Sequence, residues 1–171
     1  MIKHTISLIL YFLTANAVFA LTESIAGISN FKFGMQVSDF NSIVFDREGE
    51  RGTVIYRSSK PLQIMNKAFE PFLIFDSSGL AAVDLKFSTQ GASIEEASKT
   101  CEQLFGTAFG AIKAKYGNPD TGVKTEGNEY GTVNNVSFTA IDASGIHLSS
   151  FHLMVGCTIY VRYEKGDKNT F

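Results

Sequence analysis

Tryptophan is absent from the 171-residue sequence, which has only three prolines, three histidines and two cysteines. Lysine and arginine number 15 against 17 aspartates and glutamates, so the chain lacks the positive excess of a protein that binds nucleic acid by neutralising phosphates. It also lacks low-complexity, collagen-like and coiled-coil patterns. What is present is a globular composition, with 44% hydrophobic residues and 15 phenylalanines, enough to form a core.

Residues 1–20 (MIKHTISLILYFLTANAVFA) have the pattern of a secretory signal peptide. A short basic start precedes an apolar stretch that ends at Phe19, and Val18 and Ala20 are the small residues of a cleavage site. The apolar stretch is shorter than the roughly 20 residues that cross a bilayer, and no cysteine follows it to accept a lipid. We therefore expect a periplasmic or secreted protein without a stable membrane anchor, with one exported domain over residues 21–171.

The two cysteines, Cys101 and Cys157, can pair in such an oxidising compartment. To bind a metal instead, the two thiols would need His147, His152 or carboxylates as further ligands. The pattern favours a disulfide, with two inert buried thiols as the alternative. It predicts no metal site and no cofactor.

The best-marked element is a helix from about Ser93 to Tyr116. Ser93 and Glu96 form a capping box at its start, and Gly117 and Pro119 end it. Apolar residues recur along it at three- and four-residue steps, which predicts one buried face. These residues are Ile94, Ala97, Cys101, Leu104, Phe105, Ala108, Ile112 and Tyr116.

Alternating apolar and polar residues predict antiparallel strands in most of the remaining chain. The predicted strands are residues 31–34, 53–57, 69–75, 80–88, 136–141, 146–153 and 157–163. Val37, Phe40 and Val44 predict a short helix, and residues 46–52 a mixed-charge loop.

These elements make an α+β fold, with one long helix and one short helix packed on an antiparallel sheet. Two similar four-residue turns, Asp76–Gly79 and Asp142–Gly145, suggest that a helix-plus-hairpins unit occurs twice. The corresponding halves are residues 21–90 and 91–171.

Asp142, His147 and Ser149 or Ser150 lie close together in sequence and raise the hypothesis of a serine hydrolase. On a strand, His147 and Ser149 share a face but stand about 7 Å apart, and Asp142 belongs to a turn. The sequence also has no Gly-x-Ser-x-Gly motif. No catalytic residue is therefore predicted, and an unrecognised hydrolase is kept as an alternative.

Three residues are candidate contacts with a partner. The segment Gly127–Gly131 has no apolar periodicity and predicts a loop with Tyr130 at its tip. An exposed aromatic side chain at this tip would anchor an interface, but the slightly favoured interpretation is that Tyr130 folds back onto the core. Tyr160 and Arg162, on the polar side of the last strand, are the other two. Asn135 begins an Asn-Val-Ser triplet that matches the N-glycosylation pattern.

Two segments resemble a group of small exported bacterial domains. Residues 33–40 (FGMQVSDF) resemble its Gly-Met opening before a short helix, and Tyr116–Pro119 resembles its helix-ending Gly-x-Pro. The group includes the small outer-membrane assembly lipoprotein and the β-lactamase-inhibitor-protein-like fold. The resemblance implies helices packed on an antiparallel sheet and a role in protein binding. This sequence departs from the lipoprotein members of the group, because it lacks their lipid-accepting cysteine.

The sequence thus favours an exported, non-catalytic binding protein whose partner is another protein, as an inhibitor or an envelope accessory factor. The first alternative is a carrier of a small apolar ligand, held between the long helix and the sheet by some of the many phenylalanines. The second is the hydrolase. Nucleic acid is not an expected partner.

We expect mass spectrometry of the exported protein to find Leu21 at the N-terminus, because cleavage follows Ala20. An intact Met1 on a species extracted from membranes would contradict the predicted compartment.

Overall fold

The computed structural model describes residues 25–166 except 129 and 141, so the predicted signal peptide and Ile141 lie outside the described residues. Its α-helix, α1, spans Ile94–Tyr116, as the sequence predicts. Ser93 Oγ accepts a hydrogen bond from the Glu96 amide, and Gly117 ends the helix with a φ of 89°. None of the helices in the described part is long and apolar enough to cross a membrane.

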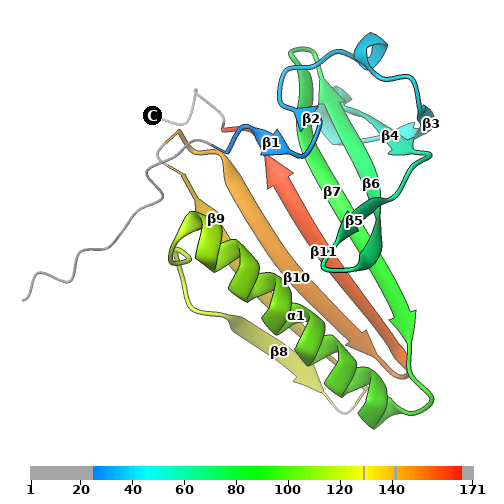
Figure 1. Cartoon of the computed structure of the whole chain (residues 1–171), viewed down its shortest axis with the longest axis vertical. Coiled ribbons are helices and arrows are strands. Elements are labelled where there is room, and N and C mark those ends of the chain that lie inside the picture. The colour runs from blue at the N-terminus through cyan, green and yellow to red at the C-terminus, as the bar shows by residue number, and fades with distance from the viewer. Residues whose placement is uncertain (1–24, 129, 141, 167–171) are drawn as a thin grey trace, which may run out of the picture.

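Eleven strands are found in the described part of the chain. They are β1 (Gly27–Ile28), β2 (Phe31–Lys32), β3 (Ile43–Glu48), β4 (Val54–Ser58), β5 (Leu62–Ile64), β6 (Lys67–Asp76), β7 (Gly79–Gln90), β8 (Lys124–Asn128), β9 (Gly131–Thr139), β10 (Gly145–Leu153) and β11 (Gly156–Glu164). Nine of them form one antiparallel sheet in the order β3-β4-β6-β7-β11-β10-β9-β8, with β5 paired to β6. The fold is therefore α+β and dominated by the antiparallel sheet (Figure 1).

The sheet consists of two meanders that meet where β7 pairs with β11. Asp76–Gly79 joins β6 to β7, whereas Asp142–Gly145 leads from β9 into β10. Across the central pair, the counterpart of the β6–β7 hairpin is β10–β11, so the two similar turns do not occupy equivalent positions. That the halves are repeats stays a prediction.

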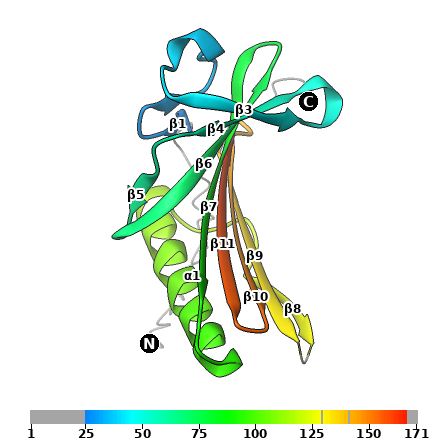
Figure 2. The same ribbon diagram turned by 90° about the vertical axis from the view of Figure 1, so that its right-hand side faces the viewer.

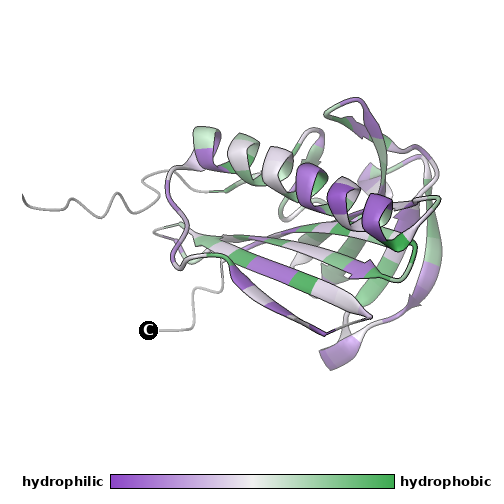
Figure 3. Ribbon diagram, turned by 90° about the horizontal axis from the view of Figure 1, so that it is seen from below, coloured by the Kyte–Doolittle hydropathy of each residue, from purple (hydrophilic) through white to green (hydrophobic). Residues whose placement is uncertain are grey.

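Helix α1 packs along β10 and β11 on one face of the sheet, as a separate layer (Figure 3). Alternation along β11 explains this arrangement: Cys157, Ile159 and Val161 are buried among the core residues, whereas Tyr160 and Arg162 point the other way. Leu85 and Leu148 continue the buried layer on the flanking strands. Figure 2 shows α1 on one side of the sheet, while the β3–β4 and β8–β9 ends bend toward the other side.

Several predicted details are wrong. The expected short helix is a 3₁₀ turn of three residues, Val37–Asp39, and Val44 belongs to β3. Residues 46–52 are a loop only in part, because β3 continues to Glu48. Ile94 is not on the buried face of α1, since it is half exposed in the first turn.

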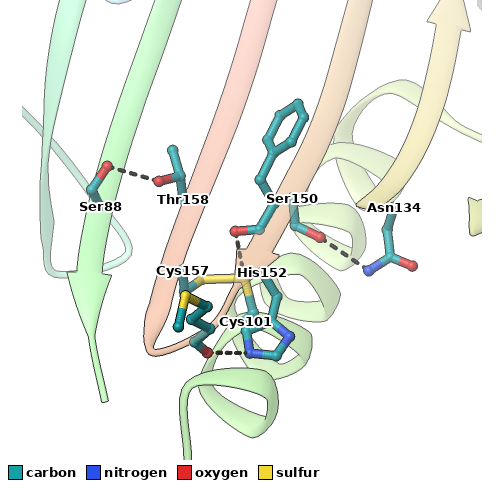
Figure 4. Close-up of a disulfide and its surroundings, with 9 residues drawn as sticks. Ser88, Cys101, Asn134, Ser150, His152, Cys157 and Thr158 are labelled. Atoms are coloured by element: carbon teal, nitrogen blue, oxygen red, sulfur yellow. Dashed lines mark hydrogen bonds between the residues drawn. A yellow bond between two sulfur atoms is a disulfide. The ribbon is translucent and has the colours of Figure 1, made fainter. Parts of the chain in front are cut away.

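The predicted bond between Cys101 and Cys157 is confirmed. It joins α1 to β11, with the two Cα atoms 5.4 Å apart and both residues almost fully buried. His152, the cross-strand neighbour of Cys157, lies beside it (Figure 4). The bond therefore fixes the N-terminal half of the helix to the sheet.

Replacing both cysteines, Cys101→Ala with Cys157→Ala, should lower the free energy of unfolding by on the order of 2–4 kcal/mol, because a loop of more than 50 residues is no longer closed in the unfolded chain. Urea denaturation under oxidising conditions measures this difference. Equal midpoints for the oxidised wild type and the double variant would contradict a stabilising role.

Candidate binding face

The sheet face opposite α1, here called the open face, carries polar and aromatic side chains. Along one line across the strands it presents Asp84, Arg162, His147 and Ser137, which are direct neighbours on β7, β11, β10 and β9. The adjacent lines carry Lys86, Tyr160 and Ser149, then Thr158 and Phe151. All of these side chains stand on paired strands, so their positions are fixed by the sheet register.

A groove of about 760 Å³ lies over the centre of this face. It is lined by nine residues of three adjacent strands: Asp84, Lys86, His147, Ser149, Phe151, Thr158, Tyr160, Arg162 and Glu164. The groove contains two of the three candidate contacts from the sequence, Tyr160 and Arg162.

Two aromatic rings form the apolar end of the groove. The Phe151 and Tyr160 rings meet edge to face, with centroids 5.6 Å apart. Lys86 Nζ lies 6.0 Å from the centroid of the Tyr160 ring. An ammonium over an aromatic face is attracted by the ring quadrupole, so Lys86 and Tyr160 hold each other in place.

The other end of the groove is ionic. Arg162 Nε lies 2.9 Å from Asp84 Oδ1, with both side chains partly exposed. Burial raises the pKa of the Asp84 carboxyl, and the nearby Arg162 opposes that shift. The contact therefore neutralises a half-buried charge in the sheet, and we expect little net stability from it.

His147 is the middle member of a hydrogen-bonded chain. Its Nε2 donates to Glu164 Oε1 at 2.8 Å, and its Nδ1 lies 2.9 Å from Ser137 Oγ. The hydrogen bond to Glu164 raises the pKa of His147, and the same bond lowers the pKa of Glu164. A serine, a histidine and a carboxylate thus meet in space around His147, but the serine and the carboxylate are not the ones that the sequence suggested.

Among the described residues, the hydrogen-bonded set Ser137, His147 and Glu164 differs from a catalytic site in two ways. The Ser137 carbonyl accepts a bond from the Asp120 amide on the side away from β10. The amide of Phe138 therefore points toward β10, where the antiparallel ladder uses it, and it cannot stabilise an oxyanion at Ser137. His147 and Glu164 are also each 41% exposed, so water screens their interaction.

The residues of the hydrolase hypothesis are not brought together. Ser150 faces the helix side, where it accepts a bond from Asn134 Nδ2, and Asp142 binds Ser144 within its own turn. His147 and Ser149 share the open face, as the strand period predicts.

Exposed apolar residues gather at the end of the open face beyond Phe151. The apolar patch consists of Tyr130, Phe151, Leu153, Met154 and Val155, which are 62%, 42%, 64%, 59% and 40% exposed. Its parts are linked by the backbone, because the Met154 amide donates to the Tyr130 carbonyl at 3.0 Å. Tyr130 is thus exposed in the turn between β8 and β9 and is not folded back onto the core, the arrangement that the sequence slightly favoured. The flanking Gly127 and Gly131, predicted as loop, belong to the strands.

The turn between β10 and β11, which the sequence left unplaced, is built from Met154 and Val155. Met154 has a φ of 51°, a conformation that favours glycine or asparagine in a two-residue hairpin. An exposed methionine at this position is unfavourable for the turn by itself.

Sequence reasoning missed Lys86, Phe151 and Glu164 as parts of the face. The strand alternation was the available signal for Lys86 and Phe151, whereas Glu164 lies just beyond the end of the last predicted strand. The alignment of β7, β11 and β10 comes from pairings distant in sequence. Asn135 lies on the same face, opposite Ser149, and Ser137 of its triplet is bonded to His147.

No family model, no curated protein and no solved structure matches this chain.

The bond between His147 and Glu164 should make stability depend on pH. The raised pKa of His147 means that its contribution is present below about pH 6.5 and is lost as the pH rises through the folded value. The lowered pKa of Glu164 means that its contribution is present above about pH 4.5 and is lost in acid. Glu164→Gln should therefore destabilise more at pH 5.5 than at pH 8.5, as urea denaturation at both values can measure.

Glu126→Gln is the matched control, because Glu126 is an exposed glutamate on β8 with no ion pair among the described residues. Equal losses for Glu164→Gln at both pH values would contradict the charge-assisted bond.

Proposed function

We propose that this is an exported, non-catalytic protein that binds another protein through the apolar patch and the adjoining groove, as an inhibitor or an envelope accessory factor. The observation that carries the proposal is the clustering of exposed apolar side chains. Nine large apolar residues are exposed in the described part of the chain, and five of them form the apolar patch. An apolar cluster bordered by charged residues is typical of a protein-interaction surface.

The rigidity of the surface supports the same function. Phe151 and Leu153 stand on a strand paired on both sides, and the disulfide anchors the neighbouring strand at Cys157. A surface that is ordered before binding loses less conformational entropy when a partner docks. The aromatic pair at its inner edge, Phe151 with Tyr160, offers large contact area with few rotatable bonds.

The carrier alternative receives less support. A cavity of about 140 Å³ lies between α1 and the sheet, lined by residues that include Met65, Ala108 and Tyr163. Pockets for small molecules have volumes of roughly 300–1,000 Å³. Phenylalanine rings occupy this side instead, with Phe109 packed against Phe105 and Phe138.

Export rests on the sequence of residues 1–20 and is compatible with the disulfide, which persists in oxidising compartments. The resemblance to exported protein-binding domains points to the same role. The hydrolase alternative is the weakest, because the backbone amide that follows Ser137 is not free to stabilise an oxyanion beside it.

The test is affinity capture from an extract of the source cells, followed by affinity measurement with the captured protein. Phe151→Ala and Tyr130→Ala should each weaken binding by more than about 1 kcal/mol, roughly a fivefold increase in Kd or more, because both remove exposed aromatic area. The melting temperature of Tyr130→Ala should not change, since its ring lies outside the core.

Phe45→Ala is the control, because Phe45 is an equally exposed aromatic on the far edge strand β3. Unchanged affinity in both patch variants, together with a loss in Phe45→Ala, would place the binding surface elsewhere and overturn the proposal.

A further inference from the structure

The groove beside the apolar patch contains one charged side chain that is not paired with another. Each carboxylate that lines it already has a partner: Arg162 Nε lies 2.9 Å from Asp84 Oδ1, and His147 Nε2 lies 2.8 Å from Glu164 Oε1. Lys86 is the remaining charged side chain of the groove. Among the described residues no carboxylate lies within ion-pair distance of its ammonium.

The surroundings of Lys86 explain why it stays available. Its cross-strand neighbours are Glu70 on β6 and Tyr160 on β11. Glu70 is exposed and makes no ion pair with Lys86, while the Tyr160 ring supports the ammonium from one side. The ammonium is thus held over the groove by an aromatic face, with its donors free to meet a further acceptor.

We infer that the occupant of the groove is a segment of a partner protein that carries a carboxylate for Lys86 next to an apolar side chain for the apolar patch. The inference rests on the proposed function and adds the chemistry of the partner. Charge complementarity favours an acidic group in the partner, because Lys86 is the charged side chain of the groove that has no ion-pair partner among the described residues. The exposed Phe151 ring favours an apolar side chain next to that carboxylate in the partner segment.

The sheet geometry sets the spacing between the two groups. Lys86 and Phe151 lie two strands apart across the sheet, and Phe151 is displaced by two residues along the strand from the position opposite Lys86. With about 4.8 Å between strands and about 3.4 Å per residue, their Cα atoms are about 12 Å apart. An extended chain covers that distance in three to four residues. The segment therefore places Asp or Glu three or four positions from an aromatic or aliphatic residue.

A displayed library of random linear dodecapeptides, selected on the full chain, tests this directly. Peptides enriched on the wild type should carry Asp or Glu three or four positions from Phe, Leu, Tyr or Trp. Their affinity should fall at least tenfold on Lys86→Glu and remain on Lys86→Arg. Selection on Lys86→Glu should enrich Lys or Arg in place of the acid.

Lys99→Glu makes the same charge change at an exposed position on α1 and should leave the affinity unchanged. Peptides that depend on Phe151 but not on Lys86 would overturn the acidic segment while leaving the proposed function intact. A selection that yields no binder dependent on Lys86 would overturn the inference. Peptides whose binding depends on neither Lys86 nor Phe151 would overturn it too, and would also count against the proposed binding face.

Discussion

The structure depends on the mismatch between one helix and a wide sheet that the helix can cover only in part. Eight strands side by side at about 4.8 Å spacing make a sheet about 34 Å across, whereas a helix with its side chains is only about 10 Å wide. Helix α1 can therefore cover only part of one face, and the disulfide between Cys101 and Cys157 fixes which part. The core follows from this layer, and the opposite face of β7, β11 and β10 is left to polar and aromatic side chains.

The open face combines two kinds of chemistry. Its ionic end is internally matched, with Arg162 beside Asp84 and His147 beside Glu164, so most of its charge is already used within the fold. Its apolar end is unmatched, since exposed side chains continue from Phe151 to the hairpin turn at Met154. Binding energy is expected at the apolar end and orientation at the ionic end, the usual division between the centre and the rim of an interface.

Local patterns in the sequence predicted the helix and the long strands of the sheet centre, but not β1, β3, β5 or β8. The Ser93 cap, the helix stop at Gly117 and the alternation in the last strand were confirmed, as was the disulfide. Only the Ser93 half of the predicted capping box forms, because Glu96 Oε2 accepts from the Ala92 amide and not from the Ser93 amide. Prediction failed where local signals were weak or misleading. Val37 and Val44 matched a helical spacing, but the chain forms only one 3₁₀ turn before β3 takes Val44 into the sheet.

The candidate site was predicted only in part for the same reason. Tyr160 and Arg162 could be placed on the polar side of one strand, but their neighbours Lys86 and His147 come from strands distant in sequence. Sheet register across β7, β11 and β10 is a tertiary property, so the groove could not be inferred from strand patterns alone.

Hydroxyl-radical footprinting of the protein with and without its captured partner tests the central claim most directly, because it reports side-chain exposure over the whole molecule in one experiment. The account predicts that oxidation of Phe151, Tyr160 and Met154 falls in the complex while that of Phe45 does not change. Protection of Phe45 with unchanged oxidation of Phe151 and Tyr160 would contradict it.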